Sequence, residues 1–263
     1  KRITRISNKK FFVFKIPTPF EVTPKKSSRG VIWSDLIDLY DEIPERNGLI
    51  VQLVLNNLHQ KILVASKHYN SAARFHQWMP YYLMPMGLKA SLLAGNVSQY
   101  EDGNVIVATV SKVGIGFDEK ESCRNWNGIR INMLILPNSI LKNEQVYGRV
   151  NRAEIPLIVE FYDKNPNVRS HFNTKKKWVA SRNGTVLEMK EKQLFCWEQI
   201  KDSIISQYIA KEPTDLKVEV DEEDDILSVP SSTKTPRATN STDILEYCNS
   251  EEYLSKMAAK FGF

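Results

Sequence analysis

Short apolar segments recur along the middle of the chain, each separated from the next by a polar or amphipathic stretch. They are residues 61–66 (KILVAS), 90–93 (ASLL), 105–109 (VIVAT), 131–136 (INMLIL) and 157–162 (LIVEFY). Their length and their β-branched and aromatic content are typical of buried strands. Residues 70–79 and 143–151 have helical spacing and lie between these strands. Four or five apolar strands that alternate with helices predict an α/β fold, a parallel sheet with helices on both faces.

The first 46 residues are basic and rich in early prolines. Pro17, Pro19 and Pro24 exclude a long helix there, because proline lacks the backbone N–H that a helix interior needs. We therefore predict extended segments, followed by a helix near residues 33–40.

A different pattern begins after residue 165. A basic run (KKKW, 175–178) is followed by a turn at 183–184, a strand over 185–189 and an amphipathic helix over 194–210. The basic run is compatible both with nucleic-acid binding and with a solvated surface. Residues 212–243 then combine acidic residues with Ser, Thr and Pro, which predicts a disordered linker.

The charge of the chain is unevenly distributed. Residues 212–225 carry eight acidic residues and one lysine, and residues 226–263 carry four charges of each sign, so the overall charge of +5 leaves +12 on residues 1–211. Clustered Lys and Arg gain affinity for polyanions by displacing phosphate counterions, so this region is compatible with a nucleic-acid partner. Residues 244–263 regain apolar spacing, which predicts a short helix that docks on this chain or on a protein partner.

Several classes of protein are excluded by composition and spacing. No apolar run approaches the ~18–20 residues of a membrane span, so we expect a soluble protein without a membrane partner. Cys123, Cys196 and Cys248 are widely separated, which favours reduced thiols over a disulfide framework or a zinc site. The four histidines have no cysteine or carboxylate at ligand spacing, so no metal site is predicted.

The segment QVYGRVNR (145–152) has the form Q-x-x-G-R-x-x-R and opens a predicted helix between two strands. On a helix, Gln145, Gly148, Arg149 and Arg152 would share one face, because they are separated by three or four residues. Two guanidinium groups on one face suit the phosphates of a nucleotide.

The segment VIVATVSKVGIGFDE (105–119) is a strand that runs into a loop with two glycines. Ligands of parallel sheets bind at the carboxyl ends of strands, and Gly114 and Gly116 could let a phosphate group approach the backbone. The segment begins its loop at Thr109, 36 residues before Gln145.

The order of these segments, with KILVASKHYNSAARF and SLLAGN before them, resembles motifs IV, V and VI of superfamily 2 helicases. The resemblance covers residues 48–165 and is strongest in QVYGRVNR. The SKVGIGFDE form is most similar to helicases of large nucleocytoplasmic DNA viruses, of the poxvirus transcript-release type. The resemblance implies a RecA-like domain, and an intracellular protein of a viral replication site or virion.

Residue roles at the nucleotide follow from the same resemblance. Arg152 would be an arginine finger that reaches the γ-phosphate of ATP, with Arg149 beside it as a second catalytic arginine. Gln145 would couple the nucleotide to the cleft between two domains. Gly116 and Asp118 would lie near the ribose.

Nucleic-acid contacts are implied at four other positions. Ser66 and Lys67 end a strand, and Gly95 follows another; all three would touch phosphates of the bound strand, with DNA preferred over RNA as the partner. Thr109 would lie near the nucleic-acid backbone. Thr109 and Asp118 are one residue further apart than the family's usual spacing.

No glycine of this chain is followed by lysine, so the phosphate loop G-x-x-x-x-G-K-[ST] is missing. ATP and Mg2+ would therefore be bound mainly by a first RecA-like domain outside this chain, with which it would form the interdomain site. The predicted organisation is a connector (1–46), a RecA-like domain (47–165), a basic accessory segment (166–211), a disordered linker (212–243) and a C-terminal helix (244–263).

Two other functions remain compatible with the sequence. A nucleic-acid-binding module could keep the RecA-like shape without hydrolysing ATP. An α/β enzyme acting on a small molecule would carry Q-x-x-G-R-x-x-R by coincidence, and it would have no affinity for polyanions.

Overall fold

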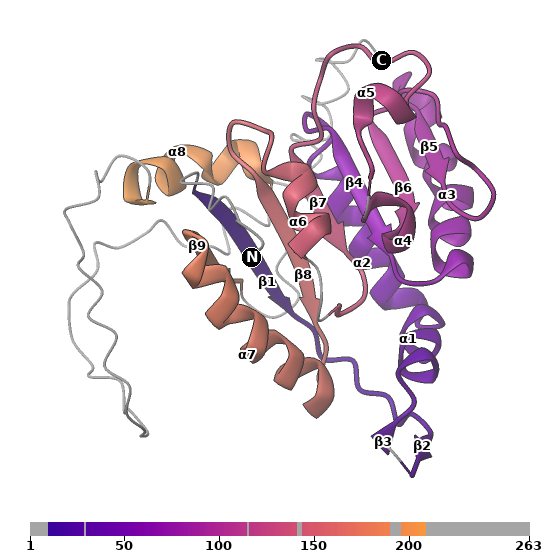
Figure 1. The fold of residues 1–263 in the computed structure, drawn as a ribbon, viewed down its shortest axis with the longest axis vertical. Coiled ribbons are helices and arrows are strands. Elements are labelled where there is room, and N and C mark those ends of the chain that lie inside the picture. Colours follow the sequence, from indigo (N-terminus) through magenta and orange to yellow (C-terminus); the bar gives the residue numbers. More distant parts are fainter. Residues whose placement is uncertain (1–9, 29, 115, 141–143, 190–195, 209–263) are drawn as a thin grey trace.

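A parallel sheet forms the centre of the molecule in the computed structural model, which describes residues 10–28, 30–114, 116–140, 144–189 and 196–208 (Figure 1). Its strand order is β5-β6-β4-β7-β8-β1-β9, and all neighbours are parallel. The seven strands are β1 (Phe11–Pro17), β4 (Ile62–Ser66), β5 (Ala90–Leu93), β6 (Val105–Thr109), β7 (Met133–Leu136), β8 (Leu157–Tyr162) and β9 (Gly184–Glu188). The α/β architecture expected of a RecA-like domain is confirmed, with more strands than the four or five that the apolar segments indicated.

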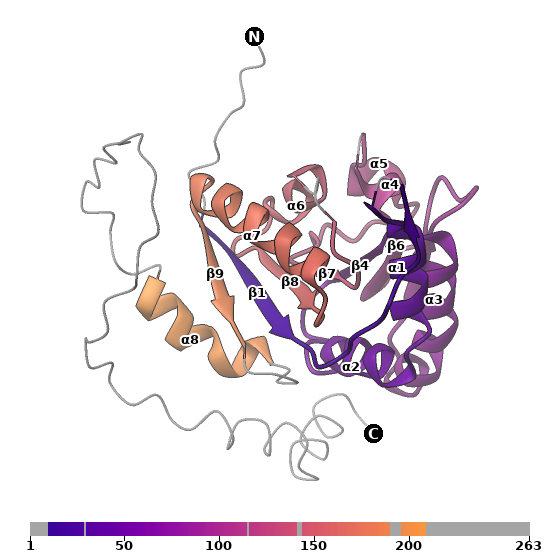
Figure 2. The same ribbon diagram turned by 90° about the horizontal axis from the view of Figure 1, so that it is seen from below.

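Helices cover both faces of this sheet. They are α1 (Trp33–Asp41), α2 (Pro44–Leu55), α3 (Tyr69–Leu83), α4 (Val110–Val113), α5 (Glu119–Ser122), α6 (Glu144–Val150), α7 (Pro166–Ser181) and α8 (Trp197–Tyr208), with a 3-10 turn, η1, at Met84–Met86. Figure 2 shows α2 and α8 on one side of the strands and α6 and α7 on the other. A small antiparallel pair, β2 (Lys26–Ser27) and β3 (Gly30–Val31), lies apart from the sheet near α1.

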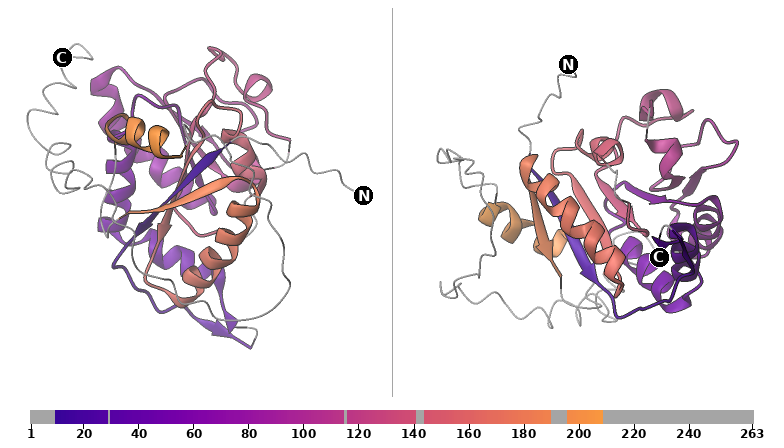
Figure 3. Two further views of the ribbon diagram at one scale, coloured as in Figure 1. Left: turned by 90° about the vertical axis from the view of Figure 1, so that its left-hand side faces the viewer. Right: turned by 60° about the horizontal axis from the view of Figure 1, so that its bottom comes forward.

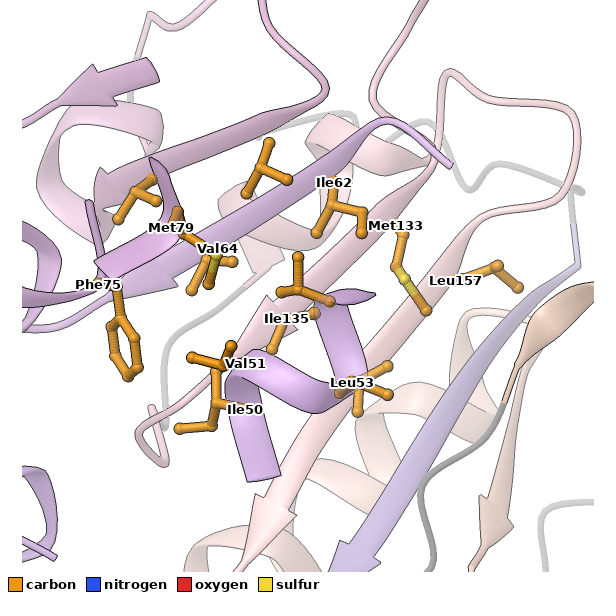
Figure 4. Close-up of a cluster of buried hydrophobic side chains, with 14 of the residues drawn as sticks. Ile50, Val51, Leu53, Ile62, Val64, Phe75, Met79, Met133, Ile135 and Leu157 are labelled. Carbon is orange, nitrogen blue, oxygen red and sulfur yellow. The ribbon is translucent and has the colours of Figure 1, made fainter. Parts of the chain in front are cut away.

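Alternate side chains of the strands enter two separate cores. Phe12 and Phe14 of β1 join the cluster that includes α2, α3 and α8, whereas Phe11 and Val13 join the cluster that includes α6. Figure 4 shows the first core, where Ile50, Val51 and Leu53 of α2 approach the strands. Burial on both faces explains why β4, β6 and β7 are almost continuously apolar.

Strand β1 lies inside the sheet, between β8 and β9. Phe12 pairs with Leu157 of β8 on one side and with Thr185 of β9 on the other. Figure 3 shows the β9 edge of the sheet, with β1 next to it. The sheet therefore extends on both sides of the predicted 47–165 boundaries, into the segments assigned to the connector and the accessory region.

Several elements differ from the sequence expectation. The helix predicted over 70–79 is longer (α3), and the basic run KKKW belongs to a helix, α7, that was not predicted. Asn165 caps α7 by accepting a hydrogen bond from the backbone N–H of Asn167, and Pro166 occupies the first turn. The turn at 183–184 is confirmed, with Asn183 at a φ of 62°.

The predicted linker (212–243) and C-terminal helix (244–263) lie outside the described residues. Within the described ranges, no helix is both long enough and apolar enough to cross a membrane.

Candidate functional site

The predicted site residues fall into two groups. One group surrounds α6 and the loop after β6, and it contains the residues assigned to the nucleotide. The other lies where β4, β5 and β6 end, and it contains the residues assigned to nucleic acid.

Arg149 connects α6 to the loop after β6. Its Nε donates to the carbonyl oxygen of Val113 (2.8 Å), its Nη1 to that of Phe117 (2.6 Å) and its Nη2 to that of Gly114. Burial, followed by the nearby charge of Arg152, lowers the pKa of Arg149 from its usual value. Arg149 therefore holds the two predicted motifs together as one unit.

Arg152 lies beyond the end of α6 and forms an ion pair with Asp118. Its Nη1 is 2.5 Å from Asp118 Oδ2, and Arg130 Nη1 is 3.8 Å from the other carboxylate oxygen. The hydrogen bond from Arg152, followed by the backbone N–H of Lys120, lowers the pKa of Asp118. Arg130 had no role in the sequence analysis, because nothing in its neighbourhood marks it as a partner of Asp118.

The expectation that all four motif residues share one helical face is corrected. Helix α6 ends at Val150, and the N–H of Ala153 donates to the carbonyl of Val150 (2.9 Å) in the turn that leads to β8. Arg152 therefore lies within this turn, while Arg149 belongs to the helix.

Gln145 and Gly116 border the same loop. A Cβ atom added to Gly114 would lie 3.6 Å from Gln145 Oε1, so the Gln145 amide lies close to the loop backbone. Gly116 has a φ of 72°, which favours glycine, and among the described residues beyond its chain neighbours no heavy atom lies within 4 Å of the position a Cβ would take. All five residues predicted for the nucleotide thus lie around one loop.

A buried polar network connects α6 to β8 and α7. Tyr147 of α6 and Lys175 of α7 both donate to the carboxylate of Glu160 on β8, and all three side chains are buried. The rings of Tyr147 and Trp178 are 5.5 Å apart, edge to face. These contacts fix the helix that carries Gln145 and Arg149, and the sequence analysis did not identify them.

The second group contains two exposed and two buried residues. Ser66 and Thr109 pair in register at the ends of β4 and β6, and their exposed fractions are only 0% and 5%. Lys67 and Gly95 are exposed. In the present conformation, Lys67 and the backbone at Gly95 are accessible to a phosphate, whereas Ser66 and Thr109 are covered.

A second buried network lies at the carboxyl ends of the strands. Arg46 of α2 donates two hydrogen bonds to Asp163, from Nε (2.8 Å) and Nη2 (2.9 Å), and a third to the carbonyl of Pro137. Thr18 Oγ1 donates to the same carboxylate (2.7 Å). Burial alone would lower the pKa of Arg46, but the charge and hydrogen bond of Asp163 more than offset it and raise the pKa. This network anchors α2 beside the second group.

Other candidate sites are weaker. No group of three or more His, Cys, Asp or Glu side chains within the described ranges could hold a metal ion. A hollow of about 370 Å3, bordered by Lys61, Lys89 and Asp102, lies at the opposite, amino-terminal edge of the strands.

Sequence comparison relates the chain to proteins of invertebrate iridescent viruses. No family model matches it. It is 22% identical to "Putative helicase 161L" of Invertebrate iridescent virus 6 over 215 residues, which is 72% of this chain and 46% of the relative. It is 24% identical to "Uncharacterized protein 108L" of Invertebrate iridescent virus 3 over 111 residues, 41% of this chain and 99% of that protein. The chain thus spans about half the length of the helicase-like relative.

Solved structures that resemble the chain share little sequence with it. T4 UvsW has a TM-score of 0.47 at 13% identity, covering 68% of this chain and 41% of its own. The Pyrococcus furiosus Hef helicase domain has a TM-score of 0.30 at 12% identity, covering 54% and 28%. The C-terminal domain of the DEAD-box protein Dbp5 has a TM-score of 0.39 at 12% identity, covering 75% and 97%.

Proposed function

We propose that this chain is the second RecA-like domain of an ATP-dependent nucleic-acid helicase or translocase. The sequence similarity to a putative viral helicase supports this assignment. The observation that carries it is the different bonding of two arginines, Arg149 and Arg152, around the loop after β6.

The two arginines have different roles in this proposal. Arg149 donates hydrogen bonds to three backbone carbonyls, so it is a positioning residue that joins α6 to the loop. Arg152 contacts the carboxylate of Asp118, and 39% of its side chain is exposed. A guanidinium held by an exposed carboxylate can exchange that partner for phosphate oxygens, so Arg152 is the arginine finger.

The donors around the loop fit the phosphates of ATP but not its Mg2+. Arg152, Arg130, the Gln145 amide and the accessible backbone at Gly116 are suited to an anion. Mg2+ prefers carboxylate ligands, and no group of three or more His, Cys, Asp or Glu side chains among the described residues could hold a metal ion. We therefore assign the Mg2+ ligands and the phosphate loop to a first RecA-like domain. ATP supplies the phosphoryl group whose transfer to water drives domain movement.

The nucleic-acid strand lies across the ends of β4, β5 and β6 in this proposal, with DNA as the preferred track. Lys67 and the Gly95 backbone contact its phosphates. Closure and opening of the two domains around ATP would shift the grip on this strand.

The test is ATP hydrolysis by the protein that contains both RecA-like domains, with and without single- and double-stranded DNA and RNA. Arg152→Ala should lower the rate by ~10³–10⁵, the usual contribution of an arginine finger. Arg124→Ala, which removes another exposed arginine, is the matched control and should leave the rate unchanged.

Retention of more than about a tenth of the rate by Arg152→Ala would contradict its role. A wild-type protein that binds nucleic acid in a salt-dependent way but hydrolyses no ATP would instead be the non-enzymatic binding module. The 263-residue chain alone should hydrolyse no ATP.

A further inference from the structure

An exposed aromatic ring lies among the residues assigned to nucleic acid. Tyr69 is the first residue of α3, three positions after Ser66, and 52% of its surface is exposed. The roles proposed for Arg149 and Arg152 do not involve Tyr69.

The ring reaches from the end of β4 toward the end of β5. A Cβ atom added to Gly95 would lie 2.9 Å from Tyr69 Cε2 and 3.2 Å from Cδ2. Because β6 lies between β4 and β5 in the sheet, the Tyr69 ring extends beyond the end of β6. It therefore lies across the surface on which the proposed strand is bound.

Gly95 packs against one edge of the Tyr69 ring. Its φ of 58° favours glycine, and any side chain there would also collide with Tyr69. The contact involves the Cδ2–Cε2 edge of the ring, and about half of the residue remains open to solvent. A ring that is held along one edge loses little further freedom when a flat ligand stacks on it.

The surroundings of the ring suit a nucleic-acid strand. Lys67 is exposed two residues earlier and supplies positive charge. Two acidic residues contact the chain beside Tyr69, and both are already engaged: Asp38 Oδ1 is 2.9 Å from His68 Nδ1, and Asp41 accepts a hydrogen bond from Ser71 Oγ. A cation beside an exposed aromatic ring is the combination with which proteins hold single strands.

We propose that Tyr69 is a stacking platform for one unpaired base of the strand that crosses the ends of β4, β5 and β6. This inference rests on the proposed function and adds to it a contact with a base, whereas Lys67 and Gly95 address the backbone. Because only an unpaired base can stack on the ring, the bound nucleic acid must be single-stranded at Tyr69.

The test compares two probes of equal length with the 263-residue chain. One is a fluorescein-labelled dT15, and the other is a 15-unit oligomer of abasic deoxyribose phosphate; rU15 is measured in parallel. Tyr69→Ala should weaken dT15 or rU15 binding by ~5- to 150-fold, the fold-change that corresponds to about 1–3 kcal/mol per stacked base. It should leave binding of the abasic oligomer unchanged, and Tyr69→Phe should bind dT15 like the wild type.

Tyr81→Ala is the matched control, because Tyr81 is on the same helix and is more exposed, at 76%. It should have no effect on either probe. Equal weakening of both probes by Tyr69→Ala, or no weakening of either, would overturn the stacking role while leaving the proposed function in place. Failure of the wild-type chain to bind any of the probes would overturn the proposed function itself.

Discussion

Two arginine–carboxylate pairs in this molecule lie at opposite extremes of burial. The side chains of Arg46 and Asp163 are 0% and 3% exposed, and their shortest contact is 2.8 Å. The side chains of Arg152 and Asp118 are 39% and 32% exposed, and their contact is shorter, at 2.5 Å. By distance alone, the Arg152–Asp118 pair would be expected to stabilise the fold more. The difference in burial reverses that expectation.

The reversal follows from what each charge would lose without its partner. A buried charge that loses its partner has no water to take the partner's place, whereas an exposed charge is hydrated at once. The buried pair is therefore obligatory for the fold, and the exposed pair can be exchanged. An exchangeable arginine is what the proposed finger requires.

The largest effect is expected from Asp163→Ala. It leaves Arg46 charged in a site without solvent, so the free energy of unfolding should fall by about 3–5 kcal/mol. Urea denaturation followed by circular dichroism measures this change. A loss of less than about 1 kcal/mol, the size expected of an exposed pair, would erase the contrast between the two pairs.

An intermediate effect is expected from Arg149→Ala. Hydrogen bonds that involve a charged group contribute about 1.5–3 kcal/mol, so we expect a loss of about 2 kcal/mol in the same measurement. Arg149→Lys keeps the charge but cannot reach three carbonyls with one ammonium group, so it should be destabilised as well. Full stability of the lysine variant would show that charge, and not the hydrogen-bond geometry, holds α6 to the loop.

Arg152→Ala should change stability by less than about 1 kcal/mol, and the difference should shrink in 1 M salt. The lowered pKa of Asp118 sets its pH dependence. The small contribution of the pair is complete above the ordinary carboxyl pKa of about 3.9, and it is lost as the pH falls through the lower pKa of the folded state. The stability of Asp118→Asn should lack this acid-dependent part. If Arg152→Ala lowered the free energy of unfolding as much as Asp163→Ala does, the contrast between the two pairs would be refuted.

The smallest effect concerns His171, which carries no ion pair in the described structure. Its ring stacks on Trp33 with centroids 4.1 Å apart, and burial, followed by the charge of Lys175, lowers its pKa. The folded state thus favours the neutral ring, so stability is complete above about pH 6.5 and declines as the pH falls toward the lower folded pKa. In melting curves between pH 7.5 and 5, His171→Phe should lose less stability on acidification than the wild type. An identical decline of stability in both proteins would show that burial does not lower the pKa of the His171 ring.

Much of the sheet could be predicted because its strands are locally apolar. The segments 90–93, 105–109 and 157–162 coincide with β5, β6 and β8. The position of β1 could not be predicted, since its neighbours are far away in the chain and alternate pairings satisfy the same pattern. Helix α7 was missed because its basic, exposed face conceals the helical period, although the Asn165-Pro166 cap was a readable signal.

The site shows the same division between local and distant information. The two motifs around Asp118 and Arg149 were recognised from their own residues, and the structure brings them together. The contacts between them join residues 32 to 36 positions apart, and Arg46 and Asp163 are 117 positions apart. No single-sequence pattern marks such pairs, because each partner is an ordinary charged residue in its own surroundings.

The place of β1 between β8 and β9 has a consequence for how the protein is made. Phe12 pairs with Leu157, so the ribosome must add about 145 residues before β1 can meet β8. At a synthesis rate of roughly 5–20 residues per second, this apolar strand waits for roughly 7–30 s. Such delayed, distant pairing slows folding and leaves an aggregation-prone segment open to chaperones. Strand β9 depends on the same event, because β1 is its one neighbour among the described strands of the sheet. The last strand of the sheet can therefore join it only together with the first strand or after it.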